Sequence, residues 1–481
     1  MNLDTISEKI ENSQTATAIR EFIGSKFFPV VTALVILICY YLGWDVVTIW
    51  YLGFVATAMF ITCRDLTPVL ALFLFMHIII SFKNSPSPLG EQSDYFLRPE
   101  ILGQIIAVIS VAVIALVARV GYNIATKAFK PSPMLFGICA FSAALLLNGA
   151  FSSEYDPLNL LYGVFLSAMF IGVFMLLTSN VEITDTTFEK IAFYFICLFV
   201  VLALELFVAY MTYDGLIVDG KVIRSKLFFG WGMYNNMGML FCVCTPASFY
   251  LAIRKRHGWI YTIVGLLNVA VTFFTMSRQS MIGAAVAGIA CVIWLLCSVK
   301  GIERSINAVL IALAAVVVLA CILGMWDEFI MYFNSVGDNF ETGSGRLILW
   351  ERAFKNFLEY PVFGVGFFGG NIDDLDPGFA GLEIIPRMYH NTFMQMLGGC
   401  GIVGLIAYIV HRLQTIWSFI KNITRERIFL AIILGVFLTV CLLDNHIFYL
   451  FPTLMYTALV ALLYASEKTG KIGGGKTKAT K

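Results

Sequence analysis

Two histidines in this sequence have surroundings that could support acid–base chemistry. The chain contains five histidines among 481 residues. His390 opens an apolar run within residues 387–391 (RMYHN), and His446 lies in the short segment 444–446 (DNH) between two apolar runs. A histidine whose pKa lies near neutrality is the usual general base. A lone histidine at a helix start also serves structural roles, so the neighbouring charges decide between the two interpretations.

Several arginines occupy positions that suit the binding of an anion. Arg278 lies in a two-residue turn between apolar runs, Arg346 begins an amphipathic segment, and Arg224 lies within residues 221–226 (KVIRSK). Arginine pairs bidentately with phosphate oxygens and keeps its charge in a dry site. Anchoring to anionic lipid headgroups explains the two lysines beside Arg224, but it explains Arg278 poorly. The arginines therefore predict a phosphate or pyrophosphate at headgroup depth.

Acidic residues give a weaker signal. Glu205 lies inside an apolar run, where a carboxylate is costly and is a functional-site hypothesis by default. It could pair with an arginine, line a cavity, or be protonated and hydrogen-bonded. Four further carboxylates fit no EF-hand spacing, and the cysteines show no zinc spacing, so a solvated acidic loop is favoured, with no metal or cofactor. These four are Asp373, Asp374, Asp376 and Glu383.

The composition is that of an all-α polytopic membrane protein. Hydrophobic residues make up 59% of the chain and charged residues 13%, and the mean hydropathy is +0.84. Apolar runs near twenty residues can each cross about 30 Å of hydrocarbon as a helix. A membrane β-barrel would show alternating segments of about ten residues instead. No basic stripe with interleaved aromatic residues supports nucleic-acid binding.

The apolar runs predict about fourteen transmembrane helices in one membrane domain, residues 27–465. A polar segment without a cleavable signal peptide, 1–26, precedes this domain, and a Lys-rich tail, 466–481, follows it. The predicted spans are 27–43, 46–62, 66–82, 100–118, 134–151, 157–177, 188–212, 231–253, 258–276, 280–297, 305–326, 388–410, 428–443 and 447–465.

The positive-inside rule predicts that both termini are cytoplasmic. That orientation places 22 of the 32 Lys and Arg residues inside, including the cluster 254–256 (RKR), the segment 412–427 and the tail. His257 and His411 then belong to basic cytoplasmic flanks. Ten basic residues are external exceptions: Lys83, Arg98, Lys221, Arg224, Lys226, Arg278, Arg346, Arg352, Lys355 and Arg387.

The longest predicted external connection, 327–387, contains an ordered element. Apolar residues recur at helical spacing from Arg346 to Tyr360, Ser344 can cap the helix, and Pro361 ends it. The glycine-rich stretch 364–370 then turns the chain. We expect an amphipathic helix at the membrane surface, which frames or plugs a cavity.

Together these segments resemble the bacterial O-antigen ligase and O-antigen polymerase (Wzy/WaaL-type) superfamily. The resemblance covers about residues 220–410 in the family's order, and the N-terminal 200 residues agree only in hydropathy. Because no proline precedes Asn235 and Asn236, the position that corresponds to the family's asparagine stays open. The segments are 224–230 (RSKLFFG) with 234–238 (YNNMG), 275–280 (TMSRQS), 345–350 (GRLILW) through 360–366 (YPVFGVG), and 390–393 (HNTF) through 398–404 (GGCGIVG).

The resemblance implies a GT-C-like membrane fold and a metal-independent glycosyltransferase in the bacterial cytoplasmic (inner) membrane. It implies transfer of an undecaprenyl-pyrophosphate-linked oligosaccharide to an acceptor glycan at the outer face, with flippase and chain-length regulator proteins as further partners. His390 would be the base, and Arg387 would orient a substrate. Arg224, Arg278 and Arg346 would hold the pyrophosphate, with support from Asn391, Glu205 and His446.

Two alternatives to a polysaccharide polymerase stay open. An O-antigen ligase would transfer the finished glycan to lipid A core or another acceptor by the same chemistry, and the layout of fourteen spans favours the polymerase. A lipid-linked glycan flippase would show inverted repeats, broken helices and charges within the membrane in both halves. Glu205 has no corresponding partner in a second half, which disfavours the transporter.

Overall fold

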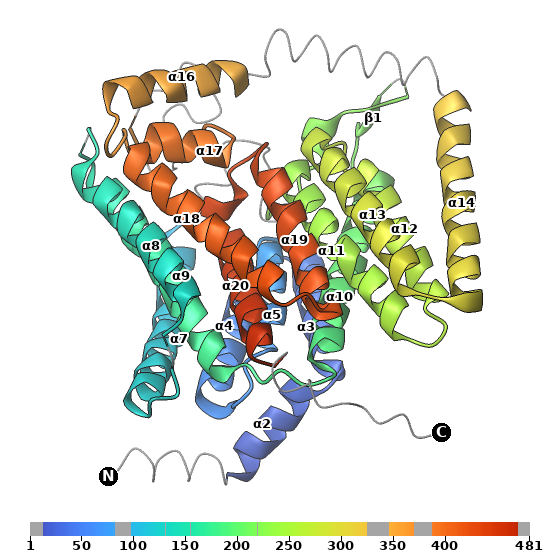
Figure 1. The fold of residues 1–481 in the computed structure, drawn as a ribbon, viewed down its shortest axis with the longest axis horizontal. Coiled ribbons are helices and arrows are strands. Elements are labelled where there is room, and N and C mark those ends of the chain that lie inside the picture. Colours follow the sequence, from blue (N-terminus) through green and yellow to red (C-terminus); the bar gives the residue numbers. More distant parts are fainter. Residues whose placement is uncertain are drawn as a thin grey trace.

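Helices form almost all of the described structure, which is a computed structural model (Figure 1). It describes residues 13–81, 98–129, 131–153, 155–218, 220–324, 346–369 and 387–469. Among these residues the sheet is a single antiparallel hairpin of β1 (Ile217–Val218) and β2 (Lys221–Val222). The predicted cap Ser344, the acidic residues between 371 and 383, and the Lys-rich tail beyond residue 469 lie outside the described residues.

All fourteen predicted apolar segments coincide with helices, which confirms the all-α polytopic membrane fold. Within the described residues, ten helices are long and apolar enough to cross a membrane, and α2 with α3, which meet at 83°, make an eleventh span if they are counted together. The ten are α4 (Asp45–Thr62), α7 (Pro99–Ala125), α8 (Pro133–Phe151), α9 (Pro157–Asn180), α10 (Thr187–Thr212), α11 (Tyr234–Arg254), α13 (Arg278–Ser298), α14 (Gly301–Gly324), the continuous stretch α17 (Thr392–Met394), η4 (Gln395–Gly399) and α18 (Cys400–Lys421), and α20 (Leu450–Thr469).

The remaining predicted spans form shorter helices, which explains why ten rather than fourteen reach full length. The full-length spans have at least 18 residues, about 27 Å at 1.5 Å per residue. The shorter elements are α3 (Phe27–Leu42), α5 (Val69–Phe75) with η1 (Met76–Ile78), α12 (Trp259–Phe273) and α19 (Arg425–Cys441). The other elements are α2 (Gln14–Gly24), η2 (Arg224–Lys226), α16 (Arg346–Glu359) and η5 (His446–Phe448).

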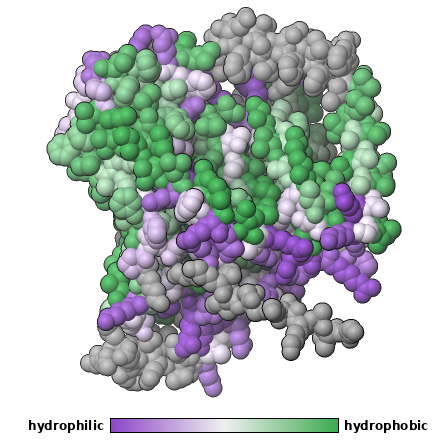
Figure 2. All heavy atoms as spheres, viewed as in Figure 1, coloured by the Kyte–Doolittle hydropathy of each residue, from purple (hydrophilic) through white to green (hydrophobic). Residues whose placement is uncertain are grey.

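Helix α11 lies at the centre of the bundle and packs against α10, α12, α13 and α19. Of the 18 most apolar residues of α11, 89% are buried, against 6% for α7 and for α14, which stand at the two edges of Figure 1. Apolar side chains cover the outside of the bundle, and hydrophilic ones gather at the end where α2 lies (Figure 2). This distribution is the one expected of a bundle surrounded by lipid.

Local sequence signals set several helix starts. Pro99, Pro133 and Pro157 occupy first helical positions, where a missing N–H costs nothing. The Asp156 carboxylate accepts the Leu158 N–H at 2.8 Å, and Ser132 caps α8 in the same way. These prolines and caps define the residues at which α7, α8 and α9 begin.

One predicted span is longer in the structure than its apolar run. The run ends at residue 410, but α18 continues to Lys421 and contains His411 and Arg412. His411 is fully buried and hydrogen-bonds Tyr456 at 2.8 Å. The Arg412 guanidinium lies 4.5 Å from the centre of the Tyr408 ring and 4.7 Å from that of Tyr456. Aromatic rings cover this charge inside the bundle, which a count of charges cannot detect.

The glycine-rich turn after α16 docks by its backbone onto the break between η4 and α18. The Val365 and Gly366 N–H groups donate to the carbonyls of Gly398 and Gly399 at 3.1 and 2.8 Å. Gly364 has φ +70°, and a Cβ there would lie 2.5 Å from the Gly399 backbone. Two of the segments that carry the family resemblance are therefore held together directly.

Replacement of Gly364 by alanine tests this docking. We expect Gly364→Ala to lower the unfolding free energy by about 1–3 kcal/mol, because a Cβ meets both a left-handed backbone and the facing Gly399. Gly121→Ala is the control, since Gly121 lies in α7 with no atom within 4 Å of its added Cβ. Thermal unfolding in detergent measures both. Equal stability of the two variants would contradict the docking.

Candidate functional site

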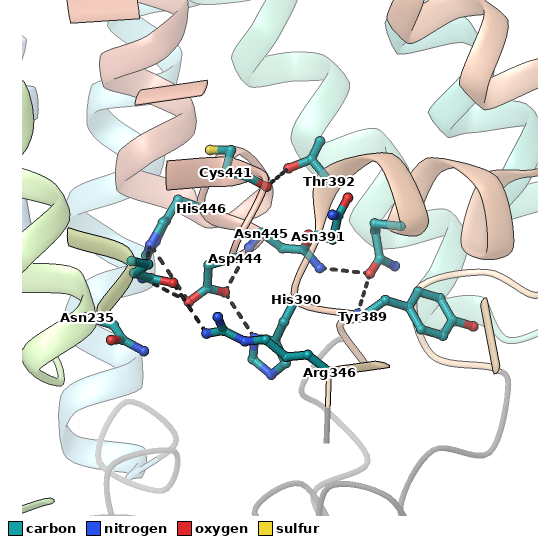
Figure 3. Close-up of polar contacts among 12 residues, drawn as sticks. Asn235, Arg346, Tyr389, His390, Asn391, Thr392, Cys441, Asp444, Asn445 and His446 are labelled. Carbon is teal, nitrogen blue, oxygen red and sulfur yellow. Dashed lines mark hydrogen bonds and ion pairs between the residues drawn. The ribbon is translucent and has the colours of Figure 1, made fainter. Parts of the chain in front are cut away.

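His390 and Asp444 form a hydrogen-bonded pair at the centre of the candidate site (Figure 3). The His390 Nδ1 lies 3.1 Å from Asp444 Oδ1, and the two side chains are 21% and 7% exposed. Because an ionised carboxylate only accepts hydrogen bonds, Nδ1 carries the proton and donates it. The His390 Nε2 atom then keeps a lone pair that can accept a proton.

The backbone of His390 is in the left-handed region, with φ +50°. Of the four such non-glycine residues in the described chain, two belong to the candidate site: His390, and Met276 with φ +56°, two residues before Arg278. A left-handed conformation costs a non-glycine residue on the order of 1–2 kcal/mol. Such strain persists where surrounding contacts impose it, and it is most frequent at functional sites.

Asp444 is buried and ionised. Burial raises the pKa of its carboxyl, but the neighbouring His446 and His390 rings, the hydrogen bond from His390 and the Asn445 N–H outweigh burial and hold the pKa well below its usual range. The Asn445 N–H donates to Asp444 Oδ1 at 2.8 Å. The carboxylate can therefore orient the His390 ring and stabilise a positive charge on it.

His446 lies on the other side of Asp444 and is fully buried. Burial lowers the pKa of its ring, and the positive charges of His390 and Arg346 lower it further, against the attraction of Asp444. The neutral ring accepts a hydrogen bond at Nε2 from the Gln279 amide, at 3.2 Å. His446 is thus better placed to support this cluster than to take a proton from a substrate.

Gln279 connects three elements of the site and was not singled out from the sequence. Its Nε2 also lies 3.4 Å from Asp444 Oδ2, and its Oε1 accepts from Arg346 Nη2 at 3.4 Å. These bonds join the start of α13, the start of α16 and the 444–446 turn. A buried glutamine leaves no trace in charge or hydropathy patterns, and its position beside Arg278 is the only signal in the sequence.

Arg278 begins α13 and has no hydrogen bond or ion pair to any described residue. Its Nε is buried and without a partner. The preceding Ser277 does not cap the helix; its hydroxyl donates instead to the Asn235 Oδ1 at 2.8 Å. A half-buried guanidinium with unused donors is suited to an anionic ligand.

Arg224 is exposed at the edge of the site. Its guanidinium lies 5.5 Å from the centre of the Tyr234 ring, at the start of α11. Tyr234 precedes Asn235, which contacts Ser277 beside Arg278. The chain of contacts therefore places Arg224 on the same end of the bundle as Arg278. Arg224, Arg278 and Arg346 form no ion pair with a carboxylate of the described residues.

Arg387 and Asn391 hold the backbone on both sides of His390. Arg387 Nη1 donates to the Phe368 carbonyl at 2.5 Å, and its N–H donates to Phe367 at 2.6 Å. The Asn391 Oδ1 caps α17, and its Nδ2 donates to the Leu442 carbonyl at 2.8 Å. These contacts are those of positioning residues.

Helix α16 also holds the His390 turn through Tyr389. The Trp350 Nε1 donates to the Tyr389 carbonyl at 3.1 Å, and the Asn356 amide donates to the Tyr389 hydroxyl at 2.7 Å. The Gln395 Oε1 accepts from the Tyr389 N–H at 3.0 Å and from Asn445 at 2.9 Å. The predicted amphipathic helix is confirmed, and its buried face fixes the residue next to His390.

Glu205 lies apart from this cluster. Its Oε2 accepts the Trp231 Nε1–H at 3.1 Å, and its Oε1 is buried without a partner. Trp231 belongs to the turn between Arg224 and Tyr234, where a bridge joins Phe228 and Met233. Of the possibilities open from the sequence, the structure shows a hydrogen-bonded carboxyl that supports the Arg224 segment, with no ion pair among the described residues.

Asp444→Asn tests the central carboxylate. An amide presents an N–H where the histidine and glutamine donors need an acceptor, so we expect a loss of about 1–3 kcal/mol of stability at pH 7. A carboxyl with a depressed pKa stabilises the folded protein above its unfolded pKa of about 4, and this contribution is lost as pH falls.

The difference between wild type and Asp444→Asn should therefore shrink below about pH 4. Thermal unfolding between neutral and acidic pH measures it, with exposed Asp214→Asn as the control. A variant as stable as the wild type at pH 7 would show that Asp444 does not hold the cluster.

The comparison with known families agrees with this geometry. Residues 263–409 match the O-antigen ligase family (Wzy_C), a segment that contains Arg278, Arg346, Arg387, His390 and Asn391. No curated protein matches the chain. The match confirms the resemblance drawn from the sequence: this membrane protein carries an O-antigen ligase family region at residues 263–409.

Proposed function

We propose that this protein is a membrane glycosyltransferase that transfers a glycan from undecaprenyl pyrophosphate to the hydroxyl of an acceptor sugar. The family match supports an O-antigen ligase or polymerase type. One observation carries the proposal. Arg224, Arg278 and Arg346 lie at one end of the bundle, beside the His390–Asp444 pair, and none of them has a carboxylate partner in the described chain.

The reaction makes two demands that these residues meet. The acceptor oxygen attacks the anomeric carbon as the bond from that carbon to the phosphate oxygen breaks. The acceptor proton passes to His390 Nε2, and Asp444 stabilises the resulting imidazolium. Lipid pyrophosphate leaves as a stable anion, so it needs positive charge rather than a proton. Arg278, Arg346 and Arg224 supply that charge without a metal ion.

The site lies at the end of the bundle opposite to α2 (Figure 1). The excess of lysine and arginine at the α2 end supports an orientation with both termini in the cytoplasm. In that orientation the site faces the extracytoplasmic side, where a lipid-linked glycan would meet its acceptor. We propose the cytoplasmic membrane of a bacterium as the location, with flippase and chain-length regulator proteins as functional partners.

Within this chemistry we propose a polysaccharide polymerase, supported by the layout of fourteen apolar segments. A ligase is the second candidate, because the matching family is described as O-antigen ligase. Purified protein in nanodiscs, given a lipid-pyrophosphate glycan alone, should form longer chains if it is a polymerase. Transfer only after addition of lipid A core would identify a ligase. No transfer with either acceptor would argue against both.

His390→Asn tests the base. Asparagine tolerates the left-handed backbone but has no basic nitrogen, so we expect glycan transfer to fall by about 10²–10⁴-fold with donor binding retained. The control is His257→Asn, because His257 is exposed and also has a positive φ, +62°. A folded His390→Asn variant with full activity would exclude His390 as the base.

Arg278→Lys tests the binding of pyrophosphate. Lysine keeps the charge but loses the planar fork, so we expect a loss of about tenfold or more in transfer rate and in affinity for the lipid-linked donor. Arg98→Lys makes the same change at the start of α7 and serves as the control. If Arg278→Lys behaves as the control does, Arg278 anchors the protein to lipid headgroups instead.

A further inference from the structure

Asn235 is a polar residue beside the candidate site that has no role in the reaction as proposed. It is the second residue of α11, and Figure 3 shows it on the α11 side of the cluster around Asp444. The Asn235 Oδ1 accepts the Ser277 hydroxyl at 2.8 Å, and Ser277 directly precedes Arg278. The Asn235 side chain therefore reaches the turn that carries one of the three arginines.

One face of α11 brings Asn235 against the start of α13. Asn235, Gly238 and Cys242 follow one another at spacings of three and four residues, so they lie on the same side of the helix. The Cys242 Sγ donates to the Ser280 carbonyl at 3.1 Å, and a Cβ on Gly238 would lie 2.2 Å from the Ser280 Oγ. The missing side chain at Gly238 thus allows the close approach that places Asn235 on Ser277.

Asn236 lies on a different face of α11. As the next residue it points about 100° away from Asn235 around the helix. A Cβ on Gly232 would lie 2.8 Å from the Asn236 Nδ2, so this amide packs against the turn before α11. Of the two asparagines that the sequence does not distinguish, Asn235 is the one that contacts the segment of Arg278.

Two buried hydroxyl groups determine which atom of the Asn235 amide faces the site. The Ser277 Oγ lies 2.8 Å from the Ser280 Oγ, and both side chains are fully buried. The Ser280 hydroxyl has no other acceptor among the described residues, so it donates to Ser277. Ser277 then has one acceptor left for its own proton, the Asn235 amide, and only the oxygen of that amide can accept. The Asn235 Nδ2 therefore points away from Ser277.

The Asn235 Nδ2 carries two N–H groups and has no hydrogen-bond partner among the described residues, and the side chain is half-buried. The Arg278 Nε is also without a partner, and it is buried. Because Asn235 contacts the residue before Arg278, the unused donors of both side chains lie at the same turn. Several N–H groups without an acceptor suit a ligand with several negatively charged oxygens, such as a phosphate.

We propose that Asn235 binds the lipid pyrophosphate through its Nδ2–H groups, together with Arg278. This inference rests on the proposed function, because it takes a lipid pyrophosphate as the ligand of the site. Ser277 and Ser280 are positioning residues that act through Asn235, since they hold the amide with its nitrogen toward the ligand. With the amide turned round, its oxygen would face the phosphate oxygens and repel them.

Direct binding of undecaprenyl pyrophosphate, without a glycan, tests the role of Asn235 independently of transfer. The dissociation constant is measured on the full chain in nanodiscs. Asn235→Asp keeps the acceptor for Ser277 but replaces the N–H donors by a negative oxygen, so affinity should fall by about tenfold or more. Asn236→Asp adds the same charge on another face of α11 and should stay within about threefold of the wild type.

A double-mutant cycle tests the positioning role of Ser277. Ser277→Ala lets the amide turn, so alone it should weaken binding by about threefold or more. In the Asn235→Ala background the same change should have no further effect, because Ser277 acts through the amide. Equal losses in both backgrounds would exclude the positioning role, and thermal unfolding shows that each variant is folded.

The outcomes separate this proposal from the proposed function. If the wild type binds undecaprenyl pyrophosphate and Asn235→Asp binds it equally well, Asn235 is not a ligand of the pyrophosphate, and the proposed function stands. Equal losses in Asn235→Asp and Asn236→Asp would attribute the effect to charge alone and would also overturn the role of the amide. If the wild type does not bind undecaprenyl pyrophosphate, the proposed function fails, and the role of Asn235 fails with it.

Discussion

The candidate site depends on the need to satisfy every backbone polar group inside an apolar bundle. His390 precedes a span whose helix is interrupted at Gly401, with φ 63° and ψ −164°. An interruption is tolerated at membrane depth only where protein groups bond to the freed backbone. The buried Asn148 amide donates to the Gly399 carbonyl at 2.5 Å, and the buried Asn159 accepts the Phe367 N–H at 2.6 Å. The Asn148 amide of α8 thus satisfies a carbonyl beside the interruption, and Asn159 of α9 holds the glycine-rich turn that packs against it.

Positive and negative charge in the candidate site are unevenly balanced among the described residues. Asp444 is matched by the His390 N–H and the Gln279 amide, so it has little negative charge left for the arginines. Arg278, Arg346 and Arg224 converge on the same end without a carboxylate partner in the described chain. Arg278 and Arg346 are half-buried, and a protein seldom holds such cations without compensation, because each cation loses hydration. In the proposed reaction a pyrophosphate would supply that compensation, most strongly as its negative charge grows in the transition state.

The sequence drew attention to charged residues of the candidate site but not to its neutral amides. Sorting lysine and arginine by side found Arg278 and Arg346, because a charge in an external turn violates a general rule of membrane proteins. The helix from Arg346 followed from its periodicity. Gln279 and Gln395 could not be found in this way, since a buried amide changes neither hydropathy nor charge. Nor does a count of charges show that two tyrosine rings cover the Arg412 guanidinium inside the bundle. All fourteen apolar segments form helices, but only ten of those in the described chain are long and apolar enough by themselves to cross a membrane, because apolar runs predict a helix but not its length.

The amphipathic helix α16 has one exposed apolar face and one face that contacts the candidate site. Its outer face carries exposed apolar side chains, with Phe354 51% exposed and Leu358 64%, as a helix at a lipid boundary would. Its inner face binds Tyr389 by both the carbonyl and the hydroxyl, so the helix fixes the residue that precedes the left-handed His390. On the other side, Asn391 is tied to the end of α19. Because His390 is held between these two attachments, the strain in its backbone is maintained by α16 as much as by its own span. The structure therefore shows α16 as a support of the His390 backbone.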